Sequence, residues 1–522
     1  MRRNLAPSFV DFIMAALVAW LFAFSAKGWG LLLQDGDTGW HIRTGEWILA
    51  NHRVPSNDLF SFTKPASEWF AWEWGSDVLF AWIHKLGGLP LIVLFAALVL
   101  VATTGILLRW LSWRGSSALV IFPLILLSVG GSTMHYLARP HIFTLLFLVI
   151  VLWLLDAERR NPSQRIWWLV PLTVFWTNLH GGWPALFVFL AIHVFCRAIY
   201  RDSYWRRDLM VMGTCAVATL LNPYGWQLHV HILNYLDSDW IRSVVDEFQS
   251  PKFRAENLLQ FEILLLAGIA TAWGRSKKGF AGLTEALYVW TWAHLSLGAV
   301  RHAPIFILAA APVIASELTA ILESSWVDAG RKSTLAVFRG LDADLKPNFG
   351  RTTAWAIVLP LVIWLSSYRQ WPQDFPSKVF PVMSRAAGEE ILKGQRTFTS
   401  DQWGDYLLYH YWPKTKVFID GRSDFFGPKV GQQYLNLLGA APNWKKTFDQ
   451  YQIDAVLLPP DNPLSLQLKS EPDWQMVHSD EVSALYRRRE RTSQSPSATL
   501  PFLAPALMKP PQPSEGIKEN SL

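Results

Sequence analysis

The sequence has few charged residues and only two cysteines. Asp, Glu, Lys and Arg make up 17% of the 522 residues, whereas 51% are hydrophobic and the mean hydropathy is +0.19. Soluble domains usually carry about 25% charged residues. Cys196 and Cys215 are too few for a disulfide framework or a thiolate metal cage. The composition therefore indicates a polytopic membrane protein that is not built around sulfur chemistry.

Motifs for nucleotide chemistry are also lacking. The sequence contains no Walker loop, no Rossmann glycine fingerprint after a strand and no HExxH on a plausible element. Nucleotide-driven transport and soluble nucleotide-sugar chemistry are therefore unsupported. The net charge of +6 comes from short Lys and Arg clusters between apolar runs. Such clusters are typical of topology signals, so we expect no nucleic-acid partner.

Apolar runs recur along the first 369 residues. A helix needs about 20 apolar residues to cross a bilayer, although shorter spans occur. The first run could be a cleaved signal peptide, but its continuation to Leu33 favours an uncleaved helix. Lys and Arg are more frequent in alternate loops, which predicts a cytoplasmic N-terminus. We predict about 11 transmembrane helices, near residues 9–33, 87–108, 117–133, 140–155, 166–178, 183–198, 209–221, 258–273, 281–298, 303–321 and 353–368.

The composition changes after the last apolar run. Short apolar runs then alternate with helical patterns and are bounded by Gly, Pro and Asp, which predicts an α/β domain. A Ser- and Pro-rich stretch at the end has too little periodic apolar content to fold. We therefore predict a transmembrane domain at 1–369 with a functional first outer loop at 34–86, an extracytoplasmic α/β domain at 370–489 and a disordered tail at 490–522.

The first outer loop carries the densest group of ionisable residues. In "QDGDTGWHIRTGEW", Asp37 and His41 are four residues apart and share a face if a helix covers them. Such a carboxylate can act as a general base, or it can hold a divalent cation with His41 beside it. Asp35 is a second candidate. The alternative is that both acids only cap the next helix.

Two later outer loops place an arginine and a histidine at the start of an apolar span. "ARPH" contains Arg139 and His141, and "RHAP" contains Arg301 and His302. The N-terminus of a helix favours anions, and a phosphate is the natural ligand of an arginine in this position. The alternative for Arg139 is an interfacial side chain that reaches lipid headgroups. The repeated pattern favours an anionic ligand.

Four further residues complete the predicted site. Asn178 and His180 in "NLHGG" offer neutral hydrogen bonds that suit sugar hydroxyls. Glu73 lies among tryptophans that we interpret as an interfacial aromatic belt, although a carboxylate is an odd neighbour there. Glu247 in "DEF" is a candidate metal ligand together with Asp37. "DQWGDY" and "FIDGRSD" in the C-terminal part are interpreted as turn and strand-end chemistry.

Together, these features resemble the GT-C superfamily of integral membrane glycosyltransferases, in particular bacterial members with an acidic "D..WH...GEW" loop. The resemblance implies transfer of a sugar from a polyprenyl-phosphate or polyprenyl-diphosphate carrier to a glycan, lipid or protein acceptor. It implies that Asp37, with Asp35 second, activates the acceptor or binds a metal such as Mg or Mn, and that Arg139 or Arg301 holds the carrier phosphate.

"QWGDYL" in the C-terminal domain is similar to the "WWDYG" signature of oligosaccharyltransferases. It lacks the paired Trp and the final Gly, so recognition of a peptide sequon is not implied.

The sequence thus predicts a glycosyltransferase in the bacterial inner (plasma) membrane, with a cytoplasmic N-terminus and a periplasmic or extracellular C-terminal domain. Two alternatives from other classes are a secondary transporter or lipid flippase and a non-catalytic membrane scaffold. A transporter is expected to carry ionisable residues near the middle of its spans, whereas here they collect at one face.

Overall fold

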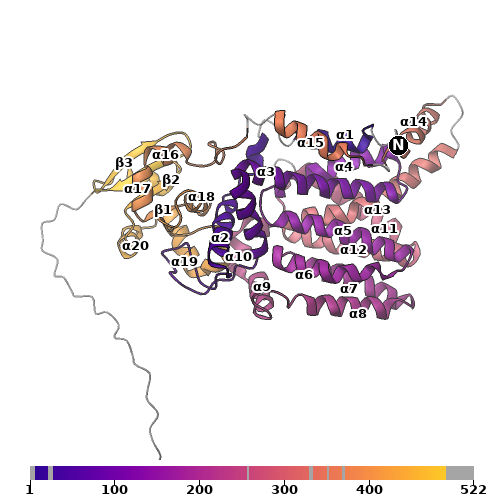
Figure 1. Ribbon diagram of the computed structural model, residues 1–522, viewed down its shortest axis with the longest axis horizontal. Helices are drawn as coiled ribbons and strands as arrows, with labels where there is room; N and C mark the ends of the chain where they lie inside the picture. The colour runs from indigo at the N-terminus through magenta and orange to yellow at the C-terminus, as the bar shows by residue number, and fades with distance from the viewer. Residues whose placement is uncertain are drawn as a thin grey trace, which may run out of the picture.

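The computed structural model describes residues 6–20, 28–254, 258–327, 333–349, 352–366 and 371–489. The tail predicted at 490–522 lies outside these residues. Figure 1 shows a bundle of roughly parallel helices on one side and a smaller part that contains the strands on the other. The architecture is therefore that of a helical membrane domain with a C-terminal mixed α/β part.

A helix lies at each of the predicted spans. Within the described ranges, five helical segments are long and apolar enough to cross a membrane by length and composition: Trp74–Trp113, Ala118–His135, His141–Arg160, Leu258–Ser276 and Val300–Trp326. The protein is therefore a mostly helical chain with several apolar spans, and the count of 11 stays a prediction. The bundle consists of α1 (Phe9–Ala19), α3 (Trp74–Trp113), α4 (Ala118–Ser132), α5 (His141–Arg160), α6 (Leu169–Leu179), α7 (Pro184–Ile199), α8 (Trp205–Ala218), α11 (Leu258–Ser276), α12 (Gly279–Gly298), α13 (Ala303–Val327) and α15 (Trp355–Ser366).

The first apolar run is shorter as a helix than expected. Ser8 caps α1, because its side chain accepts from the Asp11 amide while Asp11 accepts from the Ser8 amide. α1 is described from Phe9 to Ala19, residues 21–27 of the predicted span lie outside the described residues, and Gly28–Leu31 forms a 3₁₀ turn rather than an α-helix. The expectation of one α-helix through Leu33 is therefore wrong at its C-terminal end.

The long helix α3 is bent near its first third. Gly88 has a φ of 64°, a left-handed conformation that glycine adopts without strain, and Pro90 follows it. The bend separates a segment that packs on α2 (Asp37–Asn51) from the apolar segment predicted at 87–108. α2 approaches closely at Gly45, where a Cβ would collide with the Asp77 carbonyl. This contact holds the first loop against the bundle.

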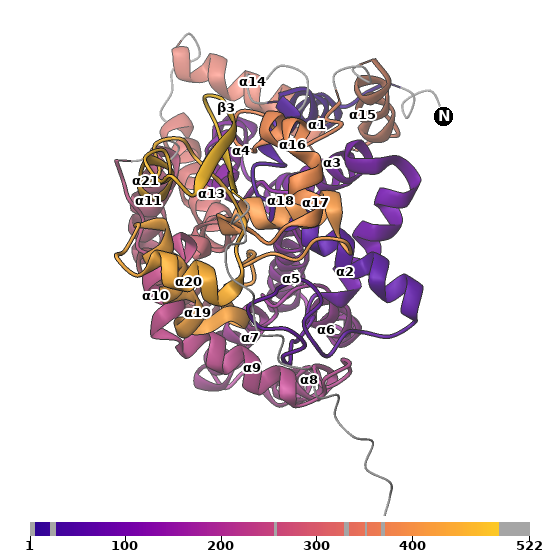
Figure 2. The same cartoon turned by 90° about the vertical axis from the view of Figure 1, so that its left-hand side faces the viewer.

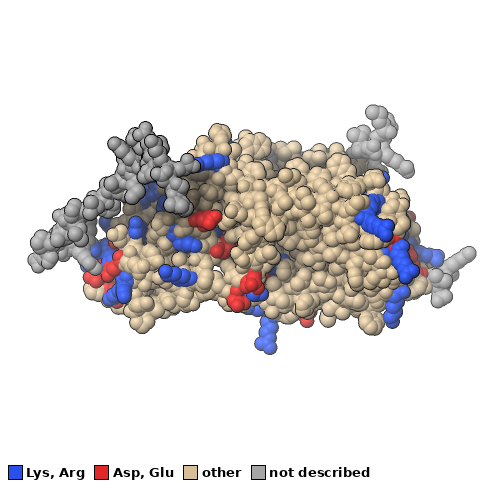
Figure 3. Space-filling model, turned by 90° about the horizontal axis from the view of Figure 1, so that it is seen from below, with Lys and Arg blue, Asp and Glu red and all other residues tan. Residues whose placement is uncertain are grey.

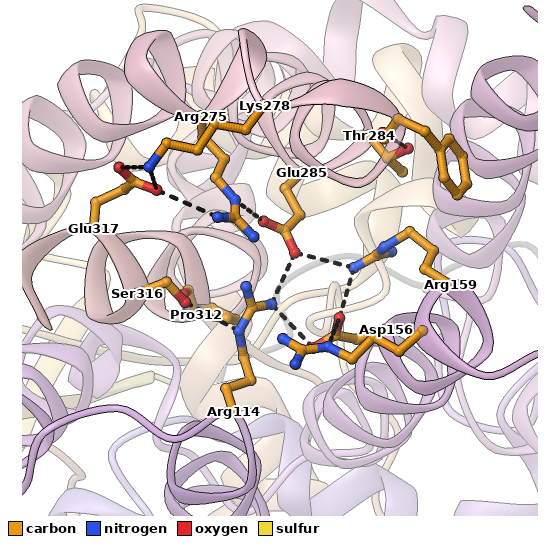
Figure 4. Close-up of polar contacts among 12 residues, drawn as sticks. Arg114, Asp156, Arg159, Arg275, Lys278, Thr284, Glu285, Pro312, Ser316 and Glu317 are labelled. Carbon is orange, nitrogen blue, oxygen red and sulfur yellow. Dashed lines mark hydrogen bonds and ion pairs between the residues drawn. The ribbon is translucent and has the colours of Figure 1, made fainter. Parts of the chain in front are cut away.

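A buried ion-pair network joins the helix ends that point away from the C-terminal domain (Figure 4). Arg114 at the end of α3 contacts Asp156 of α5 at 3.0 Å and Glu285 of α12 at 2.9 Å. Glu285 also contacts Arg275 of α11 at 2.7 Å and Arg159 of α5 at 3.4 Å. In Figure 3 this end of the molecule gathers Lys and Arg, whereas the surface over the middle of the bundle carries almost no charge. The uncharged band is the part that suits a bilayer.

The C-terminal part is built around a mixed sheet of four strands in the order β1-β2-β4-β3. β1 and β2 are parallel, whereas β4 pairs antiparallel with β2 and β3. β1 and β2 are buried along their whole length. The elements are α16 (Val382–Ala387), α17 (Glu389–Gly394), β1 (Thr397–Thr399), α18 (Asp401–Tyr411), α19 (Ser423–Leu438), α20 (Trp444–Tyr451), β2 (Ala455–Leu458), α21 (Pro463–Leu468), β3 (Trp474–Ser479) and β4 (Ala484–Arg488).

The C-terminal part covers one end of the bundle, with α18 facing α2 (Figure 2). The two helices approach at Gly39, where a Cβ would collide with the Asp405 carbonyl. Arg43 of α2 donates from Nε to the Tyr409 carbonyl at 2.8 Å and contacts Glu46 at 2.6 Å. Arg43 and Glu46 therefore face this contact rather than bulk solvent, which the sequence had not indicated.

The other α-helices among the described residues are α9 (Gln227–Asp237), α10 (Asp239–Val244) and α14 (Thr334–Phe349).

Candidate functional site

A cavity of about 870 Å³ lies where the C-terminal part meets the helical bundle. Its walls come from the start of α2, the segment before α3, the starts of α5 and α13, the loop between α6 and α7, and residues 401–435. All the residues predicted for the site except Asn178 line this cavity: Asp35, Asp37, His41, Glu73, Arg139, His141, His180, Glu247, Arg301 and His302.

Asn178 lies at the end of α6, away from the cavity lining. Its amide oxygen accepts from the Trp74 indole at 2.8 Å. Its amide nitrogen donates to the carbonyls of Val174 and Leu221, each at 2.8 Å. The side chain therefore joins the start of α3 to α6 and the loop after α8, a structural task that differs from the predicted contact with a sugar.

One arginine gathers three carboxylates on the cavity wall. Arg139 lies 2.7 Å from both Asp35 and Asp37 and 3.2 Å from Glu247. Asp37 is the first residue of α2, and the Asp35 side chain accepts from the Asp37 amide at 2.9 Å. Asp35 therefore bonds to the first amide of α2, as the capping alternative expected in part, and the catalytic role of both acids stays a prediction.

Asp37 is almost completely buried, and its second oxygen lies beside another carboxyl group. The side chain is 5% exposed, and Oδ1 accepts from no N–H or hydroxyl of the described residues, whereas the Asp405 carboxyl group interacts with Asp37 directly. Burial raises the pKa of Asp37 to about 8, although the charge of Arg139 opposes the shift. A carboxyl group with a pKa near neutrality can accept a proton from a hydroxyl at physiological pH.

The C-terminal domain supplies a second carboxyl group at Asp37, which the sequence reasoning missed. Asp405 of α18 is fully buried, and the Gly421 amide donates to its two oxygens at 3.1 and 3.2 Å. A Cβ at Gly421 would collide with Asp37 Oδ1 and lie 2.9 Å from Asp405 Oδ2, so glycine is required between the two carboxyl groups. Burial, followed by the charge of Asp37, raises the pKa of Asp405 well above its usual range.

The segment around Gly421 is held by a buried arginine. Arg422 contacts Asp420 at 2.6 Å and Asp58 of the first loop at 2.7 Å. Its guanidinium lies 4.4 Å from the Trp69 ring and 4.9 Å from the Phe60 ring. The segment 418–424, "FIDGRSD", thus joins the C-terminal part to the first loop. Gly421 between the charged Asp420 and Arg422 was the only feature of the sequence that pointed to this contact.

A second chain of polar contacts runs along the wall from α2 to α6. His41 lies 2.6 Å from Asp77 and 3.6 Å from Glu73, and His180 Nε2 lies 3.4 Å from the other oxygen of Glu73. The Gly182 amide donates to His180 Nδ1 at 2.9 Å, so Nε2 carries the proton that faces Glu73. Burial lowers the pKa of His180 well below its usual value and raises the pKa of Glu73 to about 7.

The Arg-His pairs at the starts of α5 and α13 differ in their surroundings. His141 Nε2 donates to the His135 carbonyl at 2.6 Å, and His302 Nδ1 donates to the Leu295 carbonyl at 3.1 Å. Arg301 contacts the Tyr235 hydroxyl at 3.3 Å and lies 4.3 Å from the Phe248 ring. Among the described residues, no carboxylate lies within ion-pair distance of Arg301.

The tryptophans near Glu73 wall the cavity instead of forming an interfacial belt. Trp69 is 4% exposed, and both Trp69 and Trp72 line the cavity with Trp40. Trp72 packs edge-on against Tyr235 with ring centroids 5.3 Å apart. The predicted belt is therefore wrong for these two residues, and Glu73 belongs with them because it lines the same cavity.

The residues predicted to hold a divalent ion do not fit one as they lie. Asp37 and Glu247 both contact the Arg139 guanidinium, so a positive charge already lies between them. Within the described ranges, no group of three or more His, Cys, Asp or Glu side chains is arranged to hold a metal. The arginines are the groups in this cavity that can compensate the charge of an anionic substrate.

Comparisons with known proteins rest on structure alone, since no protein-family model and no curated protein matches the sequence. The archaeal oligosaccharyltransferase AglB from Archaeoglobus fulgidus, solved with an inhibitory peptide and a dolichol-phosphate, matches with a TM-score of 0.56 and 13% identity over 92% of this chain and 74% of its own. The arabinofuranosyltransferase AftD from Mycobacteria matches with a TM-score of 0.50 and 13% identity over 94% of this chain and 42% of its own. ArnT from Cupriavidus metallidurans bound to undecaprenyl phosphate gives a TM-score of 0.49 and 14% identity over 91% of this chain and 97% of its own.

The fold and the comparisons define an integral multi-pass membrane protein. Its chain shares the fold of GT-C membrane glycosyltransferases over most of its length, at low sequence identity.

Proposed function

We propose that the protein is a glycosyltransferase that moves a sugar from a polyprenyl-phosphate carrier to a hydroxyl of a glycan, lipid or protein at the outer face of a bacterial inner membrane. One observation carries the proposal. Asp37, whose Oδ1 accepts from no N–H or hydroxyl of the described residues, and Arg301, which has no ion-paired carboxylate among them, line the same cavity. The fold shared with AglB, which was solved with a dolichol-phosphate, supports a lipid-linked donor.

In the proposed reaction, the acceptor oxygen forms a bond to the anomeric carbon while the bond from that carbon to the phosphate oxygen breaks. Asp37 takes the proton of the acceptor hydroxyl, and the bonding electrons leave with the phosphate. Arg301 stabilises the charge that develops on the phosphate, and the N-terminus of α13 adds to this stabilisation. A phosphate is a good leaving group, so correct positioning supplies much of the remaining acceleration.

The other groups of the wall position the reactants. Arg139 holds the Asp37 carboxylate in place at the start of α2. Glu73 and the imidazoles of His41 and His180 form a chain of donors and acceptors that suits sugar hydroxyls. His141 uses one ring nitrogen on the backbone, which leaves the other nitrogen for a ligand.

Cleavage of the carrier tests this proposal. The full-length protein in lipid nanodiscs would be mixed with a panel of undecaprenyl-phosphate-linked monosaccharides and a membrane extract as the acceptor source, and released undecaprenyl phosphate would be measured by mass spectrometry. We expect release from at least one donor. A flippase would move the carrier without cleaving it, and a scaffold would do neither. Failure of the wild-type protein to bind undecaprenyl phosphate contradicts the proposal.

A further inference from the structure

The cavity is lined by more acidic than basic side chains. The arginines of this lining differ in how much of their positive charge is already neutralised by paired carboxylates. Arg139 contacts Asp35, Asp37 and Glu247. Burial raises the pKa of Glu247, but the positive charges around it, led by Arg139 and including Arg301, together outweigh burial and hold this pKa well below its ordinary value, so Glu247 is ionised. An additional anion at Arg139 would therefore lie against three carboxylates.

Arg422 is compensated in the same way. Its guanidinium pairs with Asp58 and Asp420 and is enclosed by aromatic rings, and the residue is 3% exposed. A buried guanidinium with two carboxylate partners has little charge left to offer a substrate. Arg422 therefore serves the contact between the first loop and the C-terminal domain.

Arg301 is the third cation of the cavity lining, and it has the surroundings of an anion site. Its described contacts are the Tyr235 hydroxyl and the Phe248 ring, neither of which carries a negative charge. It also lies in the 3₁₀ turn Val300–His302 that leads into α13, whose N-terminus favours an anion. Within the described part of the lining, Arg301 is thus the one guanidinium without an ion-paired carboxylate.

Glu247 interacts with the positive charges of both Arg139 and Arg301. It contacts Arg139 directly and interacts with the charge of Arg301. Its side chain is 33% exposed, so its negative charge faces the cavity and is not sealed inside the wall. A ligand group that extends from Arg301 toward Arg139 meets this carboxylate.

We propose that the cavity accepts a carrier with one phosphate between lipid and sugar and rejects a diphosphate, and that Glu247 sets this preference. The inference rests on the proposed function. A phosphate that links two alcohols carries one negative charge, which matches the uncompensated guanidinium of Arg301. A diphosphate carries a second charge, which would meet Glu247 and the acids that share Arg139. Like charges brought together in a partly dehydrated site oppose binding.

Binding of the two carriers measures this preference without knowledge of the sugar. The probes are the methyl esters of undecaprenyl phosphate and of undecaprenyl diphosphate, which carry one and two negative charges as the sugar-linked carriers do. Each is added to the full-length protein in phosphatidylcholine nanodiscs, with either EDTA or magnesium present. We expect the monophosphate to bind at least about tenfold more tightly than the diphosphate under both conditions. Tighter binding of the diphosphate under either condition overturns the inference. Binding of neither carrier contradicts the proposed function itself.

Removal of the Glu247 charge tests its role directly. Glu247→Gln should raise the affinity for the diphosphate ester by about tenfold and change the affinity for the monophosphate ester less. The matched control is Asp239→Asn, because the Asp239 side chain carries the same charge on α10 but is fully exposed and is not among the residues that line the cavity. An unchanged ratio of the two affinities in a folded Glu247→Gln protein overturns the assignment. Glu247→Ala repeats the test if Glu247→Gln fails to fold.

Discussion

The Asp37 carboxylate lies 2.7 Å from the Arg139 guanidinium. This pair joins the first loop to the start of α5, two segments separated by the long helix α3 and by α4. The contact fixes the start of α2 at the cavity, where the second oxygen of Asp37 accepts from no N–H or hydroxyl of the described residues. A carboxylate held in this orientation can act as a general base.

Replacement of Asp37 should remove transfer and leave carrier binding in place. Asp37→Asn keeps the shape of the side chain but cannot accept the acceptor proton, so we expect release of undecaprenyl phosphate to fall about 100-fold or more. The matched variant Asp35→Asn leaves Asp37 intact and should lose much less. Wild-type release by Asp37→Asn, with carrier binding unchanged, would assign the chemistry to another group.

Asp405 should tolerate an uncharged isostere. Burial and the charge of Asp37 raise the pKa of Asp405 and so favour its neutral form. Asp405→Asn keeps a neutral group of the same shape against Asp37 and should retain the wild-type rate within a few-fold. Asp405→Ala leaves the Gly421 amide without its acceptor and should lower the rate about tenfold. The measurement is the initial rate of carrier release, with the unfolding temperature of each variant as the control. Equal loss in both variants would show that Asp405 acts as a charged group.

The rate of transfer should rise with pH between 6 and 9. Asp37 works in its deprotonated form and its pKa is raised to about 8, so the active fraction grows as the pH increases through that value. Glu73, with a pKa raised to about 7, loses its proton in the same range. A pH-rate profile of Glu73→Gln separates the two, because the midpoint near 8 should persist. A rate that is flat or falls across this range contradicts the role of Asp37.

The ion-pair network at the opposite helix ends should support stability without affecting the site. Glu285 compensates Arg114, Arg159 and Arg275, and its side chain is 4% exposed. Glu285→Gln leaves these buried guanidinium groups short of negative charge and should cost about 3 to 5 kcal/mol of the free energy of unfolding. Thermal unfolding in nanodiscs measures the loss. The surface variant Glu323→Gln, at a 50% exposed side chain, should change the unfolding temperature little.

Much of the cavity wall could be predicted because its residues follow local patterns. Apolar runs placed the helices, and a helix start is where a polar loop reaches the membrane edge, so Arg139 and Arg301 stood out. Asp37 and His41 share a face of α2 because they are four residues apart on a helix. These inferences needed only the period of a helix and the polarity of a bilayer.

The remaining groups depend on contacts that no local pattern reports. Asp405 reaches Asp37 because α18 packs on α2 through Gly39, a contact between distant parts of the chain. Arg422 is paired by Asp58 of the first loop, which the sequence alone gave no reason to connect. The role of Asn178 in sugar binding stays a prediction, because a polar residue at a helix end can bond to the backbone, as Asn178 does to the Leu221 carbonyl, as well as to a ligand.

The decisive measurement is a structure of the full-length protein in nanodiscs with bound undecaprenyl phosphate, because it shows whether Arg301 binds the carrier phosphate beside Asp37. We expect density for the phosphate inside the cavity, within hydrogen-bond distance of the Arg301 guanidinium and on the side of Arg301 that faces Asp37. A phosphate bound outside the cavity, or one bound inside it by groups other than Arg301, would contradict the role of Arg301.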